Sequence, residues 1–218
     1  MRKEKQRDFY IAACVLAAFV IWTAIIQFLD VQAIGPQGSA VGLATVNRFV
    51  HHLTGVHMAL YTITDWLSLV PLAFVIGFAL RGLVQWMKRK RLLNVDRNLL
   101  VLGGFYLVVM TVFALFEVVA VNYRPVLING VLEPSYPSST TMLVLCVMPT
   151  AMMQLNARIP NEGFKRCVVF AIAVFTACMV IGRLVSGVHW FTDIIGGILL
   201  SAGLVLMYRA VVRLEISL

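Results

Sequence analysis

The chain has 218 residues, of which 61% are hydrophobic and only 13% are charged, and its mean hydropathy is +0.90. Soluble globular chains average about 45–50% apolar and about 25% charged residues, so this composition excludes an ordinary soluble domain. The net charge of +8 would suit a nucleic-acid partner, but the placement of the charges gives it another explanation. The composition predicts an all-α, polytopic membrane protein in which residues 1–218 form a single domain.

Six apolar stretches are long enough, or nearly so, to cross the hydrocarbon core of a membrane, which takes roughly 20 helical residues. In chain order they are residues 9–29, 58–80, 98–121, 140–155, 167–185 and 191–208. The first follows a basic start, but it is longer than the apolar run of about 7–15 residues in a signal peptide, so we expect it to be retained. The fourth is the shortest and contains Pro149. Together the stretches predict a six-helix transmembrane bundle.

Lys and Arg residues are concentrated on one side of this predicted bundle. Fifteen of the eighteen lie in the N-terminal tail or follow the second, fourth and sixth spans, and only Arg48, Arg124 and Arg183 lie on the other side. Because cytoplasmic segments carry the excess of Lys and Arg, both termini are predicted to be cytoplasmic in a multi-pass protein of the cell membrane. The basic charge is therefore a topology signal, and we expect no nucleic-acid partner.

Between the first two spans, residues 47–53 place apolar and polar side chains at near-helical spacing. This pattern predicts a short helix lying in the outer membrane interface. For His51, His52 and His57, contact with lipid headgroups is a simpler interpretation than ligand binding or catalysis. The four cysteines lie in or at the ends of spans without C-x-x-C spacing, which predicts neither disulfides nor a zinc site.

Three segments on the predicted outer side carry polar residues that topology and packing do not explain. They are residues 122–125, 134–141 and 182–193. Because all three lie on the same face of the membrane, they can converge on one site facing outward.

The third of these segments contains His189 and Asp193. Their spacing of four places both on one face if the segment is helical. An aspartate so placed would orient the imidazole and stabilise its cation, leaving the other ring nitrogen as a base or nucleophile. Arg183 would supply a planar fork of donors suited to phosphate. The alternative is an interfacial histidine and an arginine that reaches the headgroups.

The other two segments contribute donors for an anion. Ser138, Ser139 and Thr140 stand where the fourth span begins, and a helix start presents free N–H groups and a positive dipole end. Simple N-capping by these hydroxyl residues is the alternative interpretation. Arg124, followed by Pro125, would bring a second guanidinium to the same face.

The combination resembles the type 2 phosphatidic acid phosphatase (PAP2) superfamily. The family pattern is Lys-x6-Arg-Pro, then Pro-Ser-Gly-His, then Ser-Arg-x5-His-x3-Asp. Arg124 fits the end of the first motif, Ser138 lies in the second, and the third matches in spacing at Arg183, His189 and Asp193. The resemblance implies that His189 is the nucleophile, that Asp193 orients it, and that the arginines and residues 138–140 hold the phosphoryl oxygens. It implies a membrane lipid phosphate or polyprenyl diphosphate as substrate, and no metal or other cofactor.

The chain departs from the family pattern at three places. Glu117 stands at the position of the first-motif lysine, Thr140 at the position of the second-motif histidine, and Gly182 at the position of the serine before Arg183. In the family the second-motif histidine protonates the leaving group, which a threonine does not do near neutral pH.

Three interpretations of these departures follow. In the first, the enzyme suits a leaving group that needs little protonation, such as the phosphate of a lipid diphosphate. In the second, Glu117 is the replacement acid. In the third, the chain has no catalytic activity and binds a lipid phosphate or scaffolds partners. A small transporter is a further alternative, for which Asp65 in the second span is the only ionisable candidate. The sequence does not fix the oligomeric state.

Overall fold

The computed structural model describes residues 2–215, so residue 1 and residues 216–218 of the predicted domain lie outside the described residues. Eight α-helices account for most of the chain, and no strand is formed between residues 2 and 215. The helices are α1 (Arg2–Phe28), α2 (Ala44–Thr54), α3 (Met58–Leu67), α4 (Leu69–Arg89), α5 (Arg97–Val118), α6 (Ser139–Asn156), α7 (Glu162–Val185) and α8 (Phe191–Glu215). Two short 3₁₀ helices, η1 (Pro36–Gly38) and η2 (Leu92–Asn94), lie between them. The all-helical bundle is therefore confirmed.

The predicted second span differs most from the structure. It was expected as one helix over 58–80, but the chain forms two helices that meet at Ser68 and continue to Arg89. Pro71 in the first turn of α4 has no amide hydrogen to donate to the Leu67 carbonyl, so the helical ladder loses a bond at this point. Together α3 and α4 still form one stretch long and apolar enough to cross a membrane. The third span ends at Val118 rather than at residue 121, because the chain turns there into the site loop.

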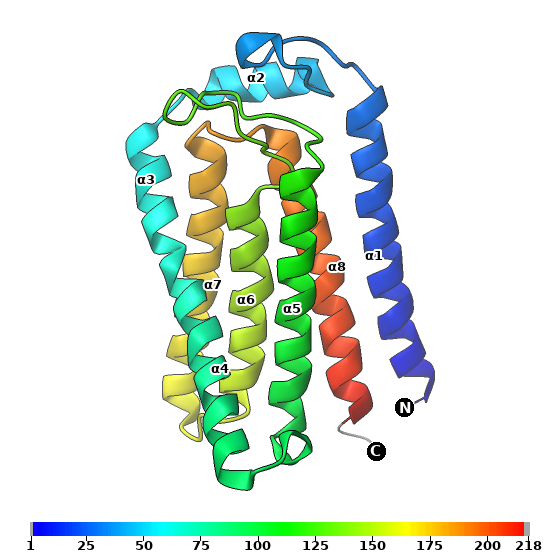
Figure 1. Cartoon of the computed structure of the whole chain (residues 1–218), viewed down its shortest axis with the longest axis vertical. Helices are drawn as coiled ribbons and strands as arrows, with labels where there is room; N and C mark the ends of the chain where they lie inside the picture. Colours follow the sequence, from blue (N-terminus) through cyan, green and yellow to red (C-terminus); the bar gives the residue numbers. More distant parts are fainter. Residues whose placement is uncertain (1, 216–218) are drawn as a thin grey trace.

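Five stretches of the described chain are long and apolar enough to be membrane spans, and α6 is the predicted span that falls outside this set. It packs against α4, α5, α7 and α8 and is the most enclosed helix of the bundle (Figure 1). Its interior position explains its polar residues: Thr150 makes a hydrogen bond with Tyr106 (3.2 Å), and Gln154 donates to Tyr208 (2.8 Å). A helix shielded from lipid by its neighbours does not need an apolar surface all round.

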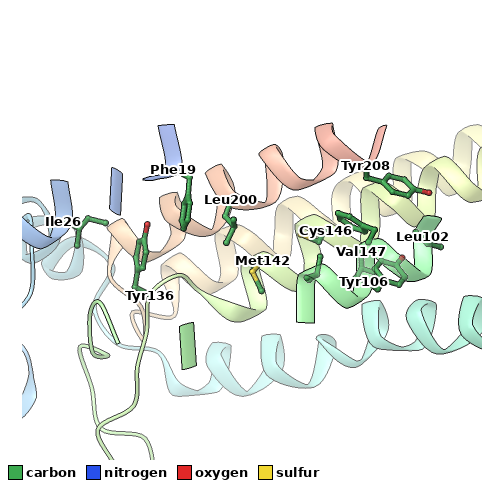
Figure 2. Close-up of a cluster of buried hydrophobic side chains, with 12 residues drawn as sticks. Phe19, Ile26, Leu102, Tyr106, Tyr136, Met142, Cys146, Val147, Leu200 and Tyr208 are labelled. Atoms are coloured by element: carbon green, nitrogen blue, oxygen red, sulfur yellow. The ribbon is translucent and has the colours of Figure 1, made fainter. Parts of the chain in front are cut away.

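Aromatic packing ties the loop before α6 into the bundle core. Tyr136 stacks on Phe19 of α1 at a centroid distance of 6.1 Å (Figure 2). Its hydroxyl makes a 2.7 Å hydrogen bond with Thr23. Its ring also fills the space beside Gly196 of α8, where a Cβ would lie 2.4 Å from a ring carbon. Tyr136 thereby fixes the neighbouring backbone, including the carbonyl group of Ser135. This loop, α2 and the turn between α7 and α8 gather at the end of the bundle opposite both termini (Figure 1).

Candidate active site

A hairpin-like loop between α5 and α6 carries Arg124 to the site. Asn129 and Gly130 both have positive φ values (51° and 79°), which are the backbone angles of a type I′ turn. This turn pairs the two arms of the loop, with Tyr123 bridged to Pro134 and the Arg124 amide donating to the Glu133 carbonyl (3.0 Å). The Asn-Gly pair between apolar residues was a sequence signal for this turn that the motif analysis did not use.

A tight turn after α7 brings His189 back to within 3.5 Å of Arg183. Gly187 has a φ of +68°, and a Cβ there would lie 1.8 Å from the carbonyl oxygen of Gly55. No other residue type fits this position without displacing backbone. The Ser186 hydroxyl closes the turn by donating to the Arg183 carbonyl (2.7 Å). His189 therefore lies in the turn before α8, and the prediction that it shares a helical face with Asp193 is wrong.

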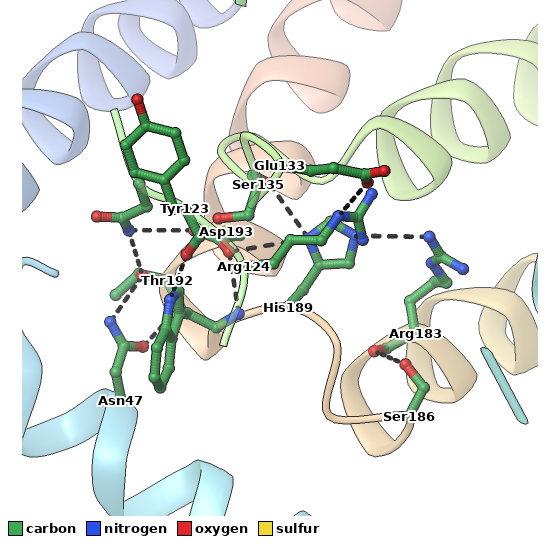
Figure 3. Close-up of polar contacts among 12 residues, drawn as sticks. Asn47, Tyr123, Arg124, Glu133, Ser135, Arg183, Ser186, His189, Thr192 and Asp193 are labelled. Carbon is green, nitrogen blue, oxygen red and sulfur yellow. Dashed lines mark hydrogen bonds and ion pairs between the residues drawn. The ribbon is translucent and has the colours of Figure 1, made fainter. Parts of the chain in front are cut away.

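The buried imidazole of His189 has one defined tautomer. Its Nε2 lies 3.2 Å from Arg124 Nη1 and 3.5 Å from Arg183 Nη2 (Figure 3). A guanidinium group has donors only, so Nε2 accepts and carries no proton. The proton is then on Nδ1, which donates to the carbonyl oxygen of Ser135 at 3.2 Å. The geometry leaves a lone pair of Nε2 between two arginines.

Burial keeps this imidazole neutral. Burial, aided by the positive charges of Arg124 and Arg183, lowers the pKa of His189 to about 4 from its ordinary 6.5, although Asp193 acts in the opposite direction. The folded protein thus holds His189 neutral above about pH 4. The unfolded chain binds a proton there below about pH 6.5, so the free energy of unfolding decreases as the pH falls from 6.5 towards 4.

We expect one histidine resonance, identified by its loss in His189→Gln, to keep the chemical shift of a neutral imidazole down to about pH 5. Nuclear magnetic resonance on histidine-labelled protein, which has four histidines, measures this directly. A resonance that titrates near pH 6.5 would show that the imidazole is solvated and free of the arginines.

Asp193 is completely buried and is held by donors other than His189. Its Oδ2 accepts from the Trp190 amide (2.9 Å), the bond that an acidic residue in a capping box makes at a helix start. Its Oδ1 accepts from the side-chain amide of Asn122 (3.1 Å). The distance from Oδ2 to His189 Nδ1 is 3.8 Å, which is an ion-pair distance but not a hydrogen bond. The backbone of Ser135, and not Asp193 as expected, is thus the hydrogen-bond partner of the imidazole.

The two arginines are buried cations whose charge is only partly balanced. Arg183 is 1% exposed; its Nη1 donates to Thr64 (3.2 Å) and lies 4.0 Å from the Asp65 carboxylate. Arg124 is 8% exposed, and its Nε lies 3.0 Å from the Glu133 carboxylate. Both guanidinium groups lie near the ring of Tyr61, at 4.8 Å for Arg183 and 6.0 Å for Arg124. Two cations that converge on one nitrogen favour an anion between them.

Close packing of α3 against α7 explains the glycine before Arg183. A Cβ at Gly182 would lie 2.8 Å from the methyl carbon of Thr64, so a serine at this position would push α3 away. The same threonine places its hydroxyl against Arg183. The departure from the family pattern at Gly182 therefore accompanies a hydroxyl supplied from α3.

The hydroxyl residues lie at the start of α6, as predicted, but they do not cap it through their side chains. Ser138 is the N-cap residue without a side-chain capping bond, and Ser139 is the first helical residue. Ser138 is completely buried, and within residues 2–215 its Oγ and that of Ser135 have no hydrogen-bond partner. Thr140 lies one residue further into α6 and is buried. The Ser138 amide donates to the Asp193 carbonyl (3.1 Å) and the Ser135 carbonyl contacts His189, so these buried hydroxyls without partners lie close to the imidazole and suit the oxygens of a phosphoryl group.

Glu117 stands on the last turn of α5, at the rim of the site. It lines a small cavity together with His189, Ser135 and Ser139. Residues 2–215 contain no group of three or more His, Cys, Asp or Glu side chains that could hold a metal ion.

Sequence reasoning missed a second set of polar residues behind Asp193. Asn47 of α2 is completely buried and makes hydrogen bonds with Thr192 (Figure 3). The Thr192 hydroxyl also accepts from Asn122. No short motif contains these residues, because Asn47 and Thr192 are 145 positions apart. The only signal was an asparagine within an otherwise amphipathic segment.

Comparison with known proteins identifies related families and folds. The family model described as the PAP2 superfamily matches residues 10–216. Among solved structures, the chain is similar to a transmembrane PAP2-type phosphatidylglycerolphosphate phosphatase from Bacillus subtilis. The two are 20% identical with a TM-score of 0.60, over 94% of this chain and 96% of that one, a likeness that shows a shared fold. Comparison with curated protein sequences finds no match.

Proposed function

The chain belongs to the PAP2 superfamily, and we propose that it is an integral-membrane phosphatase that hydrolyses a lipid phosphate or lipid diphosphate through His189. The observation that carries the proposal is the unprotonated Nε2 of a buried imidazole between the guanidinium groups of Arg124 and Arg183. A neutral nitrogen nucleophile beside two phosphate-binding cations is what phosphoryl transfer to histidine requires.

In the proposed reaction the phosphoryl group binds between Arg124 and Arg183, with the start of α6 and the hydroxyls of Ser138, Ser139 and Thr140 around its oxygens. Nε2 of His189 forms a bond to phosphorus while the bond from phosphorus to the leaving oxygen breaks, and the leaving group takes the electron pair. The imidazole now carries positive charge, which the Ser135 carbonyl and the carboxylate of Asp193 stabilise from the Nδ1 side.

Water then attacks the phosphorus, and the bond to Nε2 breaks. Inorganic phosphate leaves, the proton of the attacking water passes to phosphate or solvent, and the neutral imidazole is restored. The two arginines supply the positive charge throughout, so the proposal includes no metal ion or other cofactor. From the distribution of Lys and Arg, we propose that the site faces outward and that both termini are cytoplasmic.

The absence of a histidine at Thr140 predicts the preferred substrate class. A lipid alcohol leaves as a basic alkoxide and gains about 10²–10⁴-fold from a general acid, whereas a phosphate leaving group, with a second pKa near 6, leaves without one. We therefore expect a higher kcat/KM for undecaprenyl pyrophosphate than for phosphatidic acid or phosphatidylglycerophosphate. Phosphate release by purified protein in detergent, without added metal, measures the ranking; equal rates on all three lipids would contradict it.

The same assay tests the proposal as a whole. A histidine-bound phosphoryl group is acid-labile and base-stable, so quenching the reaction with base should leave label from a phosphate-labelled substrate on the protein. No label and no phosphate release from any of the three lipids would favour a protein that binds a lipid phosphate without catalysis.

Glu117 is our candidate for a replacement acid, because it lines one cavity with His189 and Ser139. We expect Glu117→Gln to lower the rate on phosphatidic acid by about 10²-fold and to leave the rate on undecaprenyl pyrophosphate almost unchanged. Measuring both substrates with one protein preparation provides an internal control for folding. An unchanged rate on phosphatidic acid would remove Glu117 from the mechanism.

A further inference from the structure

The α2 helix, which lies across the site end of the bundle (Figure 1), is joined to the turn that carries His189. Asn47 Nδ2 donates to the Gly42 carbonyl (2.8 Å) and to the Thr192 hydroxyl (2.9 Å), while its Oδ1 accepts from the Thr192 amide (3.2 Å). Every polar atom of this fully buried side chain is therefore used. This buried network holds Asn47 and Thr192 in one relative position, because the loss of any partner would leave an unpaired buried polar group at a cost in free energy.

Two further contacts carry this connection to both sides of His189. Asn122 Nδ2 lies 3.4 Å from the Thr192 hydroxyl and 3.1 Å from Asp193 Oδ1. The side chain of Asn122 therefore links Thr192, which binds Asn47, to Asp193. His51 Nε2 makes a 3.1 Å contact with the Gly187 carbonyl. A displacement of α2 would thus move the turn before His189 and the helix start after it.

The remaining surface of α2 divides into an apolar face and a polar face. Val46, Phe49 and Leu53 are 44%, 64% and 68% exposed, and at about 100° per residue they lie within an arc of about 60°. Arg48 and His52 lie on the third side of the helix. The helix α2 thus packs one face against its own protein and exposes one apolar face and one polar face. Such a helix fits the boundary between the acyl chains and the headgroups of a bilayer.

The apolar face of α2 continues the membrane-spanning surface at both of its ends. Before it, Phe28 and Leu29 at the outer end of α1 are 82% and 56% exposed; after it, Val56 and Met58 at the start of α3 are also exposed. Apolar side chains are therefore exposed on α2 and on the helices that precede and follow it in the chain. Because the helices on both sides of α2 in the chain also expose apolar side chains, we infer that the lipid bilayer covers the apolar face of α2.

We propose that the apolar face of α2 is seated in the outer leaflet and that this seating, through Asn47, sets the geometry of Asp193 and His189. Asn47 is then a positioning residue, and the rate of phosphoryl transfer depends on the lipid surface as well as on the substrate. The dependence of the rate rests on the function proposed above, whereas the seating of α2 does not.

The seating is tested by fluorescence quenching in vesicles of phosphatidylglycerol and phosphatidylcholine. Phe49→Trp and His52→Trp are compared with the parent protein, which contains four tryptophans. We expect the added fluorescence of Phe49→Trp to be quenched by lipids brominated on the acyl chain, and that of His52→Trp by aqueous iodide. Quenching of residue 49 by iodide, or cross-linking of two copies through residue 49, would overturn the proposal.

The coupling is tested by the double variant Phe49→Ser/Leu53→Ser, with His52→Ser as the control on the polar face. We expect the double variant to lower kcat by roughly 10- to 100-fold in these vesicles, with KM and the melting temperature nearly unchanged, because small misplacements of reacting groups cost this much. His52→Ser should retain the parent kcat. In an Asn47→Ala background the two apolar changes should add a smaller loss than in the parent, since the Asn47 link is already cut and only the contact from His51 to Gly187 remains.

A double variant with the parent kcat, or losses that simply add to that of Asn47→Ala, would overturn the coupling. If the parent protein releases no phosphate from any lipid, the proposed function fails, and the quenching experiment still decides whether α2 is seated in the bilayer. If the parent is active and α2 is in water, this inference fails alone.

Discussion

The variant His189→Gln is expected to lose phosphate release by at least about 10⁴-fold, because Nε2 of His189 is the nucleophile in the reaction that we propose. Glutamine can accept a hydrogen bond from Arg124 in place of Nε2, so the arginines keep a partner and the buried pocket keeps most of its volume. The loss should therefore come from chemistry and not from unfolding. Phosphate release from undecaprenyl pyrophosphate, measured beside the melting temperature, gives both quantities.

His52→Gln is the matched control for this experiment. His52 is exposed on α2, on the polar side of the helix, so the same change of residue type should leave the rate at the parent level. The base-stable, acid-labile label expected on the parent protein should be absent from His189→Gln and present in His52→Gln. Activity in His189→Gln within 10-fold of the parent would mean that a different group attacks phosphorus.

Replacing Arg183 by Lys is expected to lower kcat/KM by about 10²–10³-fold, the usual effect of removing one donor from a preorganised anion site. The change keeps the positive charge but removes the planar fork that reaches Thr64 and His189 at the same time. A lysine ammonium is also more strongly hydrated than a guanidinium and is held less well in a pocket that is 1% exposed. The decrease should appear mainly in kcat, since the fork is aligned with the imidazole that attacks.

Arg209→Lys serves as the control for this substitution. Arg209 is an exposed residue of α8, far along the helix from Asp193, and the same change there should leave kcat/KM within a factor of two of the parent. A full rate in Arg183→Lys would show that charge alone suffices at this position. The planar fork of Arg183 would then not be needed for phosphate release, and the role proposed for His189 would be unaffected.

The membrane bundle was predictable from sequence because burial in lipid is a property of each segment by itself. A stretch such as residues 98–121 must be apolar and long, whatever its neighbours are, and five such stretches appear in the described structure. The breaks within these stretches were less predictable. The interruption at Ser68 lies one turn before Pro71, and the short, polar α6 is tolerated because other helices surround it.

The site residues were predictable to the extent that their spacing is local. Arg183 lies in the last turn of α7 and His189 in the turn that follows, so their short separation along the chain keeps them close in space. Arg124 was placed beside them by its motif, and the Asn129-Gly130 turn explains how the loop returns towards α6. Glu117 and the residues around Ser138 were likewise found, and their roles remain proposals.

The sequence by itself thus determined that this chain crosses a membrane as helices and which residue types gather on one face, because hydropathy and motif spacing are encoded within short windows. The tertiary structure alone decided that the Ser135 carbonyl and not Asp193 accepts the hydrogen bond from the imidazole Nδ1, and that Asn47 of α2 supports the helix start that carries Asp193. A backbone carbonyl has no sequence signature, and partners 145 positions apart meet only when the whole bundle has packed.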